Sequence, residues 1–311
     1  MKVLFLSGGR GTPKLIEGFR SIVRDEAISV IVNTADDEII YGLYISPDVD
    51  TIVYLFSNQL DTEKYWGIKG DTFNFMKFLR RLLEDSWFNL GDRDLAMHIF
   101  RTIMIQRGLK LSEVTKIVCR KLGVKSKIMP MTDSQVRTRV ITELGELSFQ
   151  EFHVKYRDRP QVYSIKFEGL SEAKPSEGVV KAIEEANILV IGPSNPINSI
   201  GPILGVRGIR EAICRSRAVK VAVSPLVKGR PFSGPADKFM RACGLEVSSL
   251  SIANLYKDLI DYFVLDFEDD VSDEDISDLG VKPVRAKIYM GNADSKIRLA
   301  KLVLSLMEAK N

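Results

Sequence analysis

The sequence predicts an α/β protein with a Rossmann-like parallel sheet core, a mostly helical insertion and a small β-hairpin region. Short apolar, β-branched runs end directly in clusters of glycine, proline or small polar and acidic residues, at 2–6, 28–32, 188–191 and 219–223. The first run leads through a glycine loop into helical periodicity, which is the βαβ pattern of parallel pairing. Ligands of an open parallel sheet bind outside the carboxyl ends of the strands, so these loops are expected to share one crevice.

The first half of the chain is expected to be mainly helical outside its strands. Leu15, Ile16 and Phe19 form an apolar stripe at helical spacing directly after the glycine loop. Helical spacing returns over about 61–122, with apolar residues at every fourth position from 95 to 103. We expect this segment to be a helical insertion that lies over the sheet.

The second half alternates between the two kinds of structure. Over about 136–169, apolar and polar residues alternate around a turn, which predicts a small β-hairpin region. Helices are expected near 179–183 and over 240–260, a short strand over 262–265, and a closing helix over 297–306. We interpret residues 1–311 as a single α/β domain that contains both the insertion and the β-rich segment.

The composition argues against several classes of protein, namely nucleic-acid-binding, disulfide-rich and membrane-spanning ones. The 311 residues are 45% hydrophobic, and 44 basic against 41 acidic residues give a formal charge of +3, which favours neither nucleic acid nor an anionic membrane as partner. The three cysteines are too few and too widely spaced for a disulfide framework, and we expect buried free thiols. No run is long enough to span a membrane and the start lacks a secretory pattern, so a cytoplasmic protein is expected.

The glycine loop is the first candidate binding element. Gly8, Gly9 and Gly11 allow backbone angles and close approaches that side chains would block. Thr12 suits the N-cap of the following helix and Pro13 its first position. Free amides at a helix start bind anions, so the loop is predicted to cradle a phosphate; a tight structural turn is the alternative.

The same loop matches neither common nucleotide motif. No GK[ST] sequence follows it as in a Walker loop, and Lys14 stands where the third glycine of a dinucleotide fingerprint belongs. This departure argues against a nicotinamide-dependent oxidoreductase.

Four carboxylates form the second candidate cluster. Asp36 and Asp37 directly follow a strand, and Asp48 and Asp50 lie in a proline-framed segment. Carboxylates beside a phosphate site suit Mg2+, or one of them could serve as a general base toward a hydroxyl. Turn formation is the alternative, because aspartate is common in turns and caps.

A third cluster combines charge with aromatic residues over 87–98. Arg93 has the planar fork that clamps phosphate or carboxylate groups. Asp94 and His98 are four residues apart and share a helix face, which indicates a local hydrogen bond more often than a metal site. A surface ion pair is the alternative for Arg93.

The last candidates follow the two later strands. The loop over 192–202 is too rich in Pro, Asn and Ser for helix or strand, and its side chains could read a base or a sugar. Ser224 and Pro225 end the next strand, and two cations follow over 228–230. Both segments could be plain βα loops, but two long loops at one sheet edge favour a ligand.

Taken together, these segments resemble the 2-phospho-L-lactate transferase family of deazaflavin coenzyme biosynthesis. The matching segments occur in the family's order and spacing and cover nearly the whole chain, namely 8–15, 32–37, 46–51, 90–94, 129–133, 192–196 and 224–225. The resemblance implies a cytoplasmic, Mg2+-dependent archaeal enzyme, typically homodimeric. It would move the phospholactyl group of lactyl-2-diphospho-5'-guanosine onto 7,8-didemethyl-8-hydroxy-5-deazariboflavin (Fo), giving GMP and coenzyme F-420 without its glutamate tail. Bacterial relatives use an enolpyruvyl donor, which stays open here.

The resemblance also suggests roles for single residues. Asp50 and Arg93 are expected to be catalytic, and Asp50→Asn is expected to abolish transfer with the fold intact. Fo is expected to contact Asp48, Asp50, Trp87 and Asn89, the last of which is often basic in relatives. Mg2+ is expected on Asp36, Asp37 or Asp50. The donor's phosphates and guanosine are expected to contact Gly8, Gly9, Arg10, Gly11, Thr12, Lys14, Ser194, Asn195, Pro196 and Ser224.

One alternative belongs to another functional class. A related family with the same kind of core binds UDP-sugars and regulates metabolism without a known reaction. It shares the glycine loop and the Asp36-Asp37 pair, whereas the segments over 46–50 and 90–94 favour the transferase.

Overall fold

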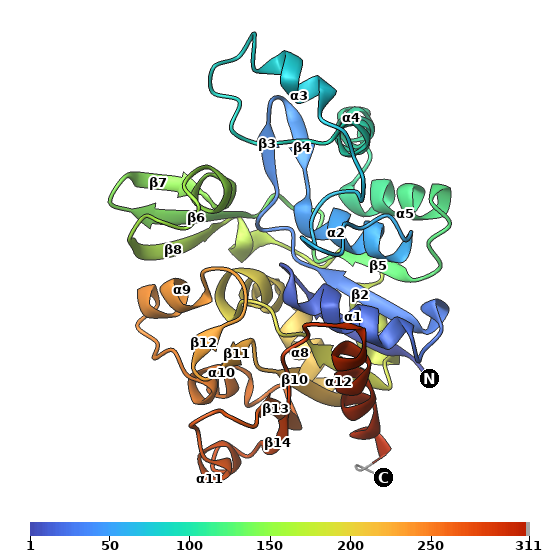
Figure 1. Ribbon diagram of the computed structural model, residues 1–311. Helices are drawn as coiled ribbons and strands as arrows, with labels where there is room; N and C mark the ends of the chain where they lie inside the picture. The colour runs from blue at the N-terminus through green and yellow to red at the C-terminus, as the bar shows by residue number, and fades with distance from the viewer. Residues whose placement is uncertain (309–311) are drawn as a thin grey trace.

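The core of the protein is a seven-stranded sheet in which every neighbouring pair of strands is parallel. The computed structural model describes residues 1–308, and Figure 1 shows the sheet crossing the middle of the molecule. Along the sheet the strands are β14 (Lys282–Ala286), β13 (Tyr262–Asp266), β10 (Val219–Val223), β9 (Ile188–Ile191), β1 (Val3–Ser7), β2 (Ile28–Val32) and β5 (Lys127–Pro130).

The direction in which the chain builds the sheet reverses between β1 and β9. From β1 the chain adds β2 and then β5 on one side; it then returns to β9 and adds β10, β13 and β14 on the other. This is the doubly wound, Rossmann-like order, and the reversal is the point where such folds open a ligand crevice. The predicted fold class is therefore confirmed.

Helices cover both faces of the sheet, and alternate residues of each strand face opposite helical layers. Phe5 of β1 packs edge-on against Phe19 of α1 (Gly11–Arg20), with ring centroids 5.0 Å apart. This layer also holds α12 (Ala293–Ser305), which packs along α1. Leu4 and Leu6 face the opposite layer, which contains α6 (Val179–Glu185), α8 (Ile209–Arg215) and α10 (Ser249–Tyr256).

The segment between β2 and β5 carries the helices expected there, but they begin earlier than the periodicity suggested. It consists of the hairpin β3 (Glu38–Ile40) and β4 (Leu43–Ile45), then α2 (Pro47–Phe56), α3 (Asn74–Leu79), α4 (Asp92–Gln106) and α5 (Leu111–Lys121). α3 lies at the outer end of the molecule, above the hairpin (Figure 1). The α2 helix begins with Pro47 at its first position. Proline suits this position because it has no N–H group, and the N–H of a first helical residue has no partner within the helix.

The β-rich segment folds as predicted into antiparallel strands, β6 (Arg137–Thr142), β7 (Gly145–Ser148) and β8 (Val162–Glu168). Between β7 and β8 lies a π-helix, η2 (Glu151–Lys155). Three short helical turns occur elsewhere, η1 (Asp25–Ala27), η3 (Leu170–Glu172) and η4 (Pro196–Ile200), the last running into α7 (Gly201–Gly205).

The carboxyl-terminal part differs from the expectation at two places. The helix expected over 240–260 is two helices, α9 (Ala236–Ala242) and α10, because Gly244 between them adopts a left-handed φ of 71°. Of the three thiols expected to be buried, only Cys119 is, whereas Cys214 and Cys243 are exposed. The remaining elements are the hairpin β11 (Leu226–Val227) and β12 (Arg230–Pro231) and the helix α11 (Asp273–Ser277).

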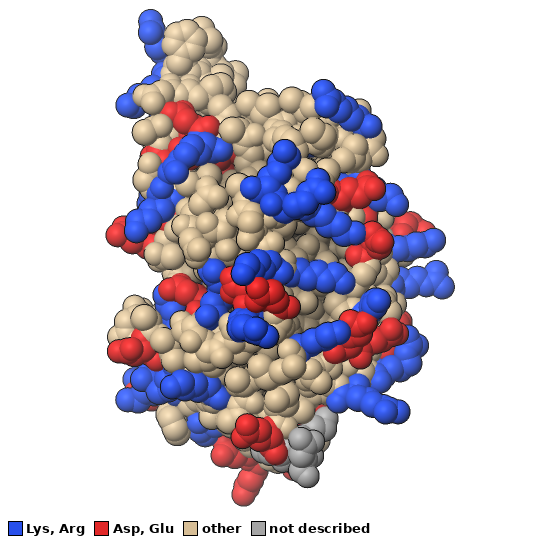
Figure 2. Space-filling model, turned by 90° about the vertical axis from the view of Figure 1, so that its right-hand side faces the viewer, with Lys and Arg blue, Asp and Glu red and all other residues tan. Residues whose placement is uncertain are grey.

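Two surface properties bear on function. Basic and acidic side chains are interspersed over the face in Figure 2, in keeping with the formal charge of +3. Among residues 1–308, no helix has the length and apolar character needed to cross a bilayer.

Candidate functional site

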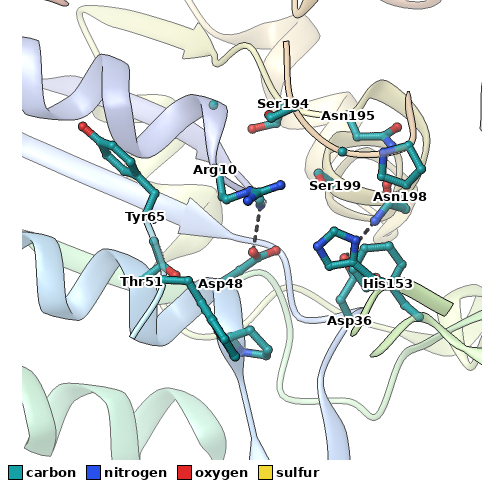
Figure 3. Close-up of a pocket in the computed structure, with 18 of the residues that line it drawn as sticks. Arg10, Asp36, Asp48, Thr51, Tyr65, His153, Ser194, Asn195, Asn198 and Ser199 are labelled. Carbon is teal, nitrogen blue, oxygen red and sulfur yellow. Dashed lines mark hydrogen bonds between the residues drawn. The ribbon is translucent and has the colours of Figure 1, made fainter. Parts of the chain in front are cut away.

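A cavity of about 340 Å3 lies at the reversal point of the sheet. Its walls come from the β1–α1 loop, the loop after β9, the first turn of α2 and η2, with the segment around Tyr65 on another side (Figure 3). Segments that are far apart in sequence thus meet at the carboxyl ends of β1 and β9, as the sequence predicts.

The glycine loop packs so closely against the loop after β9 that side chains at Gly8 and Gly11 would clash with it. A Cβ on Gly11 would lie 1.8 Å from the Pro193 carbonyl oxygen, and a Cβ on Gly8 would lie 2.7 Å from the Ser199 Cβ. Gly9 adopts a φ of 60°, which suits glycine. Glycine is therefore required here for close approach, and the loop exposes its backbone to the cavity.

Hydroxyl groups join the same two loops. The Ser194 Oγ donates to the Gly8 carbonyl, and the Thr12 Oγ1 lies 2.6 Å from the Ser194 Oγ. The expected cap is wrong in detail: α1 begins at Gly11, with Arg10 as N-cap, so Thr12 and Pro13 are already inside the first turn. The helix starts earlier because Gly11 tolerates the contact with Pro193, and Thr12 uses its hydroxyl to bind the neighbouring loop.

Of the other predicted phosphate and guanosine contacts, some line the cavity and some do not. Arg10 and Asn195 line it. Lys14 lies with its Nζ 5.1 Å from the centre of the Tyr65 ring, and burial lowers its pKa, as does, to a lesser extent, the charge of Arg10. Pro196 begins η4, next to the lining residues. Ser224 is buried behind the cavity, with its Oγ 2.9 Å from the Ser249 Oγ.

Two carboxylates face the cavity beside the glycine loop. The Asn33 Nδ2 donates to the Asp36 Oδ2 at 3.0 Å and to the Asp48 Oδ2 at 3.1 Å, so one amide joins both. The Gly9 amide donates to the Asp48 Oδ1 at 2.7 Å. Burial raises the pKa of Asp36 well above its ordinary value, and the charge of Asp48 adds to that shift. Burial also raises the pKa of Asp48, to about 6.

The pair leaves oxygen atoms without partners. The Asp36 Oδ1 and the Asn198 Oδ1 are both buried and accept no hydrogen bond, although the Asn198 Nδ2 donates to the Asp36 Oδ2 at 3.0 Å. Buried acceptors are normally satisfied. Carboxylate and amide oxygens are ligands that Mg2+ and Ca2+ use, so these residues have the chemistry to hold a hard divalent cation.

The other two predicted acidic residues point elsewhere. Asp37 is buried and accepts a hydrogen bond from the Ser46 Oγ at 2.9 Å, and burial raises its pKa to about 8. Asp50 is paired with Arg101 and lies 3.6 Å from the Nδ1 of His98. Neither residue lines the large cavity; Asp50 borders a much smaller one between α2 and α4.

The candidates from the third cluster also lie outside the cavity lining. Arg93 is about half exposed and pairs with Asp71, its Nε 3.6 Å from the carboxylate. The Asn89 Oδ1 accepts a hydrogen bond from Arg80 at 3.0 Å. Trp87 packs edge-on against Phe88, with ring centroids 5.5 Å apart.

The structure adds an aromatic wall that the sequence reasoning missed. Tyr65 and Trp66 line the cavity beside α1, where the Tyr65 ring packs on Lys14, whereas Phe149, Gln150 and His153 line it from η2 and the residues just before it. The adjacent aromatic residues at 65–66 lie in a segment without regular structure, which is a signal that could have marked them. No comparable signal marks Phe149 and His153, because they reach the cavity through the position of η2.

Fold and site together define a Rossmann-like protein with a glycine loop, a pair of buried carboxylates and aromatic side chains around a cavity at its switch point. The family model described as 2-phospho-L-lactate transferase CofD matches residues 3–295. Proteins named 2-phospho-L-lactate transferase are 42% identical in Methanosarcina acetivorans (98% of this chain, 99% of the relative) and 40% identical in Methanococcus maripaludis strain S2 (all of both chains). A third, from Methanopyrus kandleri, is 42% identical over 99% of this chain and 98% of its own. The chain therefore belongs to the 2-phospho-L-lactate transferase family, which places it among the transferases of coenzyme F-420 biosynthesis.

Solved structures support the fold separately. A Bacillus halodurans protein described as a member of the UPF0052 family aligns with a TM-score of 0.66 at 17% identity, over 97% of this chain and 98% of its own. At that identity the likeness concerns the fold alone.

Proposed function

We propose that this protein transfers the phospholactyl group of lactyl-2-diphospho-5'-guanosine to the terminal ribityl hydroxyl of Fo, giving GMP and F-420 without its glutamate tail. Family membership supports the transferase class. The cavity at the switch point supports the substrate class, since it combines an anion-binding loop with a wall of flat aromatic side chains.

The observation that carries the proposal is the carboxylate pair beside the glycine loop. Asp36 and Asp48 share the Asn33 amide, and Asp48 is bonded to the loop through the Gly9 amide. Two buried carboxylates repel one another, and a divalent cation between them and a diphosphate would remove that repulsion. A site built only to bind a neutral molecule would have no use for this arrangement.

We propose Asp36 and Asp48 as the residues that would hold Mg2+, with the Asn198 Oδ1 as a further oxygen donor. When bound, the ion would neutralise charge that develops on the phosphates during transfer. Asp37 is less suited, because it does not line the cavity and one of its carboxylate oxygens accepts a hydrogen bond from the Ser46 Oγ.

The two walls of the cavity suggest a division between the substrates. The backbone of the glycine loop, Arg10 and the hydroxyl-linked Ser194 are proposed to bind the donor diphosphate, and Asn195 to lie toward its guanosine. Tyr65 and Trp66 are proposed to take the deazaflavin ring, because stacked aromatic contacts suit a flat ligand. Phosphoryl transfer depends mainly on such positioning and on charge neutralisation.

Asp50 has a different proposed role from the one expected at the sequence level. It holds α2 to α4 through Arg101, and α2 carries Asp48 in its first turn. We propose that Asp50 is a positioning residue for Asp48. Arg93 would have to leave its contacts with Asp71 and the Lys69 carbonyl to reach a ligand in the cavity.

The test is a product assay with purified protein, Mg2+ and Fo, read by mass spectrometry. The lactyl donor is expected to give phospholactyl-Fo with an equal amount of GMP. Turnover only with the enolpyruvyl donor would keep the reaction type and change the substrate. No product with either donor, together with thermal stabilisation by a UDP-sugar and none by GDP and Fo, would contradict the proposal and favour a nucleotide-sugar-binding regulator.

A further inference from the structure

His153 is held in a fixed orientation at the cavity wall by contacts on two sides. Its Nδ1 lies 2.8 Å and 3.0 Å from the two carboxylate oxygens of Asp158. Its ring stacks on Phe149, with centroids 5.3 Å apart and planes 10° from parallel. Within residues 1–308 the Nε2 has no hydrogen-bond partner, and the residue lines the cavity (Figure 3).

The backbone that carries the pair has an unusual conformation at both ends. His153 lies in the π-helix η2, and π-helical turns are frequently found at functional sites. Arg157 and Asp158 both adopt left-handed angles, with φ of 53° and 56°. Such angles are costly for residues with side chains, and persist where the surroundings enforce them.

A lysine from another element supports that strained turn. The Lys238 Nζ of α9 donates to the carbonyl oxygens of Asp158, Arg159 and Pro160, at 2.5 Å, 3.0 Å and 3.1 Å. One ammonium group therefore fixes the turn that presents the Asp158 carboxylate to His153. Surface ion pairs seldom have this much support, so the arrangement indicates that the orientation of the imidazole matters.

The chemistry of such a pair is well defined. A carboxylate at Nδ1 keeps the proton on that nitrogen, which leaves Nε2 as a proton acceptor. The ring lines the same cavity as Asp36 and Asp48. It is not part of the carboxylate pair, because its Nδ1 contacts the Asp158 carboxylate.

We propose that His153, oriented by Asp158, is the general base of the transfer reaction; this rests on the function proposed above. The Nε2 takes the proton from the attacking hydroxyl as its oxygen forms a bond to the phosphorus that bears the lactyl group. The bond from that phosphorus to the bridging oxygen breaks, and GMP leaves with the electron pair. The imidazolium then releases its proton to water.

The proposal is tested with His153→Ala and Asp158→Asn in the product assay, with exogenous imidazole as a second variable. Loss of a general base typically costs about 10²- to 10⁴-fold in rate. We expect kcat of His153→Ala to fall by about that factor while the KM for the donor changes little, and added imidazole to restore part of the rate. Asp158→Asn is expected to lower kcat less, and imidazole should not improve it.

Lys155→Ala is the matched control, because Lys155 lies on the same π-helix and pairs with Asp85 away from the cavity. It is expected to keep wild-type kcat. If His153→Ala does not fold, His153→Asn takes its place, since the amide can still donate to Asp158.

The outcomes separate the two proposals. A wild-type protein that turns over while the His153 variant keeps kcat within about threefold would overturn the base role alone. So would a folded, slow variant that imidazole fails to accelerate, because that result indicates a structural role. A wild-type protein that makes no product would overturn the proposed function, and the base role with it.

Discussion

The Arg101 guanidinium of α4 donates to the Asp50 carboxylate of α2 in the protein interior, where the side chains are 4% and 6% exposed. Arg101 also lies 3.2 Å from the Nδ1 of His98, whose Nε2 is 3.4 Å from Asp94. This buried network fixes α2 against α4. The sequence suggests Asp50 as a catalytic residue, whereas we propose from its position that it holds the helix that carries Asp48.

The Asp50–Arg101 pair leads to a prediction about stability. Asp50→Asn leaves the buried Arg101 charge uncompensated, so the free energy of unfolding is expected to fall by about 3 kcal/mol. The double variant Asp50→Leu, Arg101→Met should recover much of that loss, because apolar replacement of a buried ion pair is often tolerated. Urea denaturation of both variants measures the effect. A single variant as stable as the wild type, but inactive, would instead support the direct catalytic role expected from the sequence.

Metal binding distinguishes the candidate ligands. Asp36→Asn and Asp48→Asn are each expected to weaken Mg2+ binding at least tenfold at pH 7.5. A tenfold change in Kd corresponds to a loss of about 1.4 kcal/mol in binding free energy. Asp37→Asn is the matched control and should bind Mg2+ like the wild type, since Asp37 does not line the cavity. Isothermal titration calorimetry gives the three affinities. Loss of binding in the Asp37 variant alone would place the metal elsewhere.

Asp37 also predicts a pH dependence of stability. Its pKa is about 8 in the folded protein against an ordinary value of 3.8, because burial penalises the charged form. A group with a raised pKa contributes its stabilisation fully below about pH 4, and this contribution falls as the pH rises toward 8. Asp37→Asn should therefore gain stability relative to the wild type between pH 5 and pH 7.5. Urea unfolding in metal-free buffer measures this, and a difference independent of pH would show that Asp37 is already ionised.

The close packing of Gly11 against the Pro193 carbonyl can be tested by adding one methyl group at Gly11. Gly11→Ala would place its Cβ 1.8 Å from the Pro193 carbonyl oxygen, so we expect a loss of about 3 kcal/mol in unfolding free energy and of most activity. Gly201→Ala is the control, since Gly201 also begins a helix but its Cβ would lie 3.2 Å from the nearest atom. Equal thermal stability of the two variants would contradict the packing described here.

Much of the fold was predictable because β-branched runs and helical periodicity are local signals. The glycine loop and the loop at Ser194 were predictable too, since both follow strands that the sequence marks clearly, and parallel strands end at one edge. The direction of a carboxylate is not a local property. Asp36 and Asp37 are adjacent in sequence, yet only Asp36 faces the cavity, because the chain turns at this point, with the Asp37 amide donating to the Thr34 carbonyl.

The residues that the sequence did not reveal reach the site through long-range packing. Asp50 is partnered by Arg101 from a different helix, which no spacing rule connects to it. His153 is brought to the cavity by a π-helix between two antiparallel strands, and Asp158 reaches it through a left-handed turn. Neither conformation has a reliable signature in the amino-acid sequence.

Both substrates are proposed to meet in the cavity that the glycine loop and the aromatic side chains line. A crystal structure with Mg2+, GDP and Fo tests this claim most directly. We predict the diphosphate against Ser194 and the amides of Arg10 and Gly11, the metal ion between it and the Asp36–Asp48 pair, and the deazaflavin ring against Tyr65 and Trp66. Nucleotide bound at another edge of the sheet, with this cavity filled only by water, would contradict the claim.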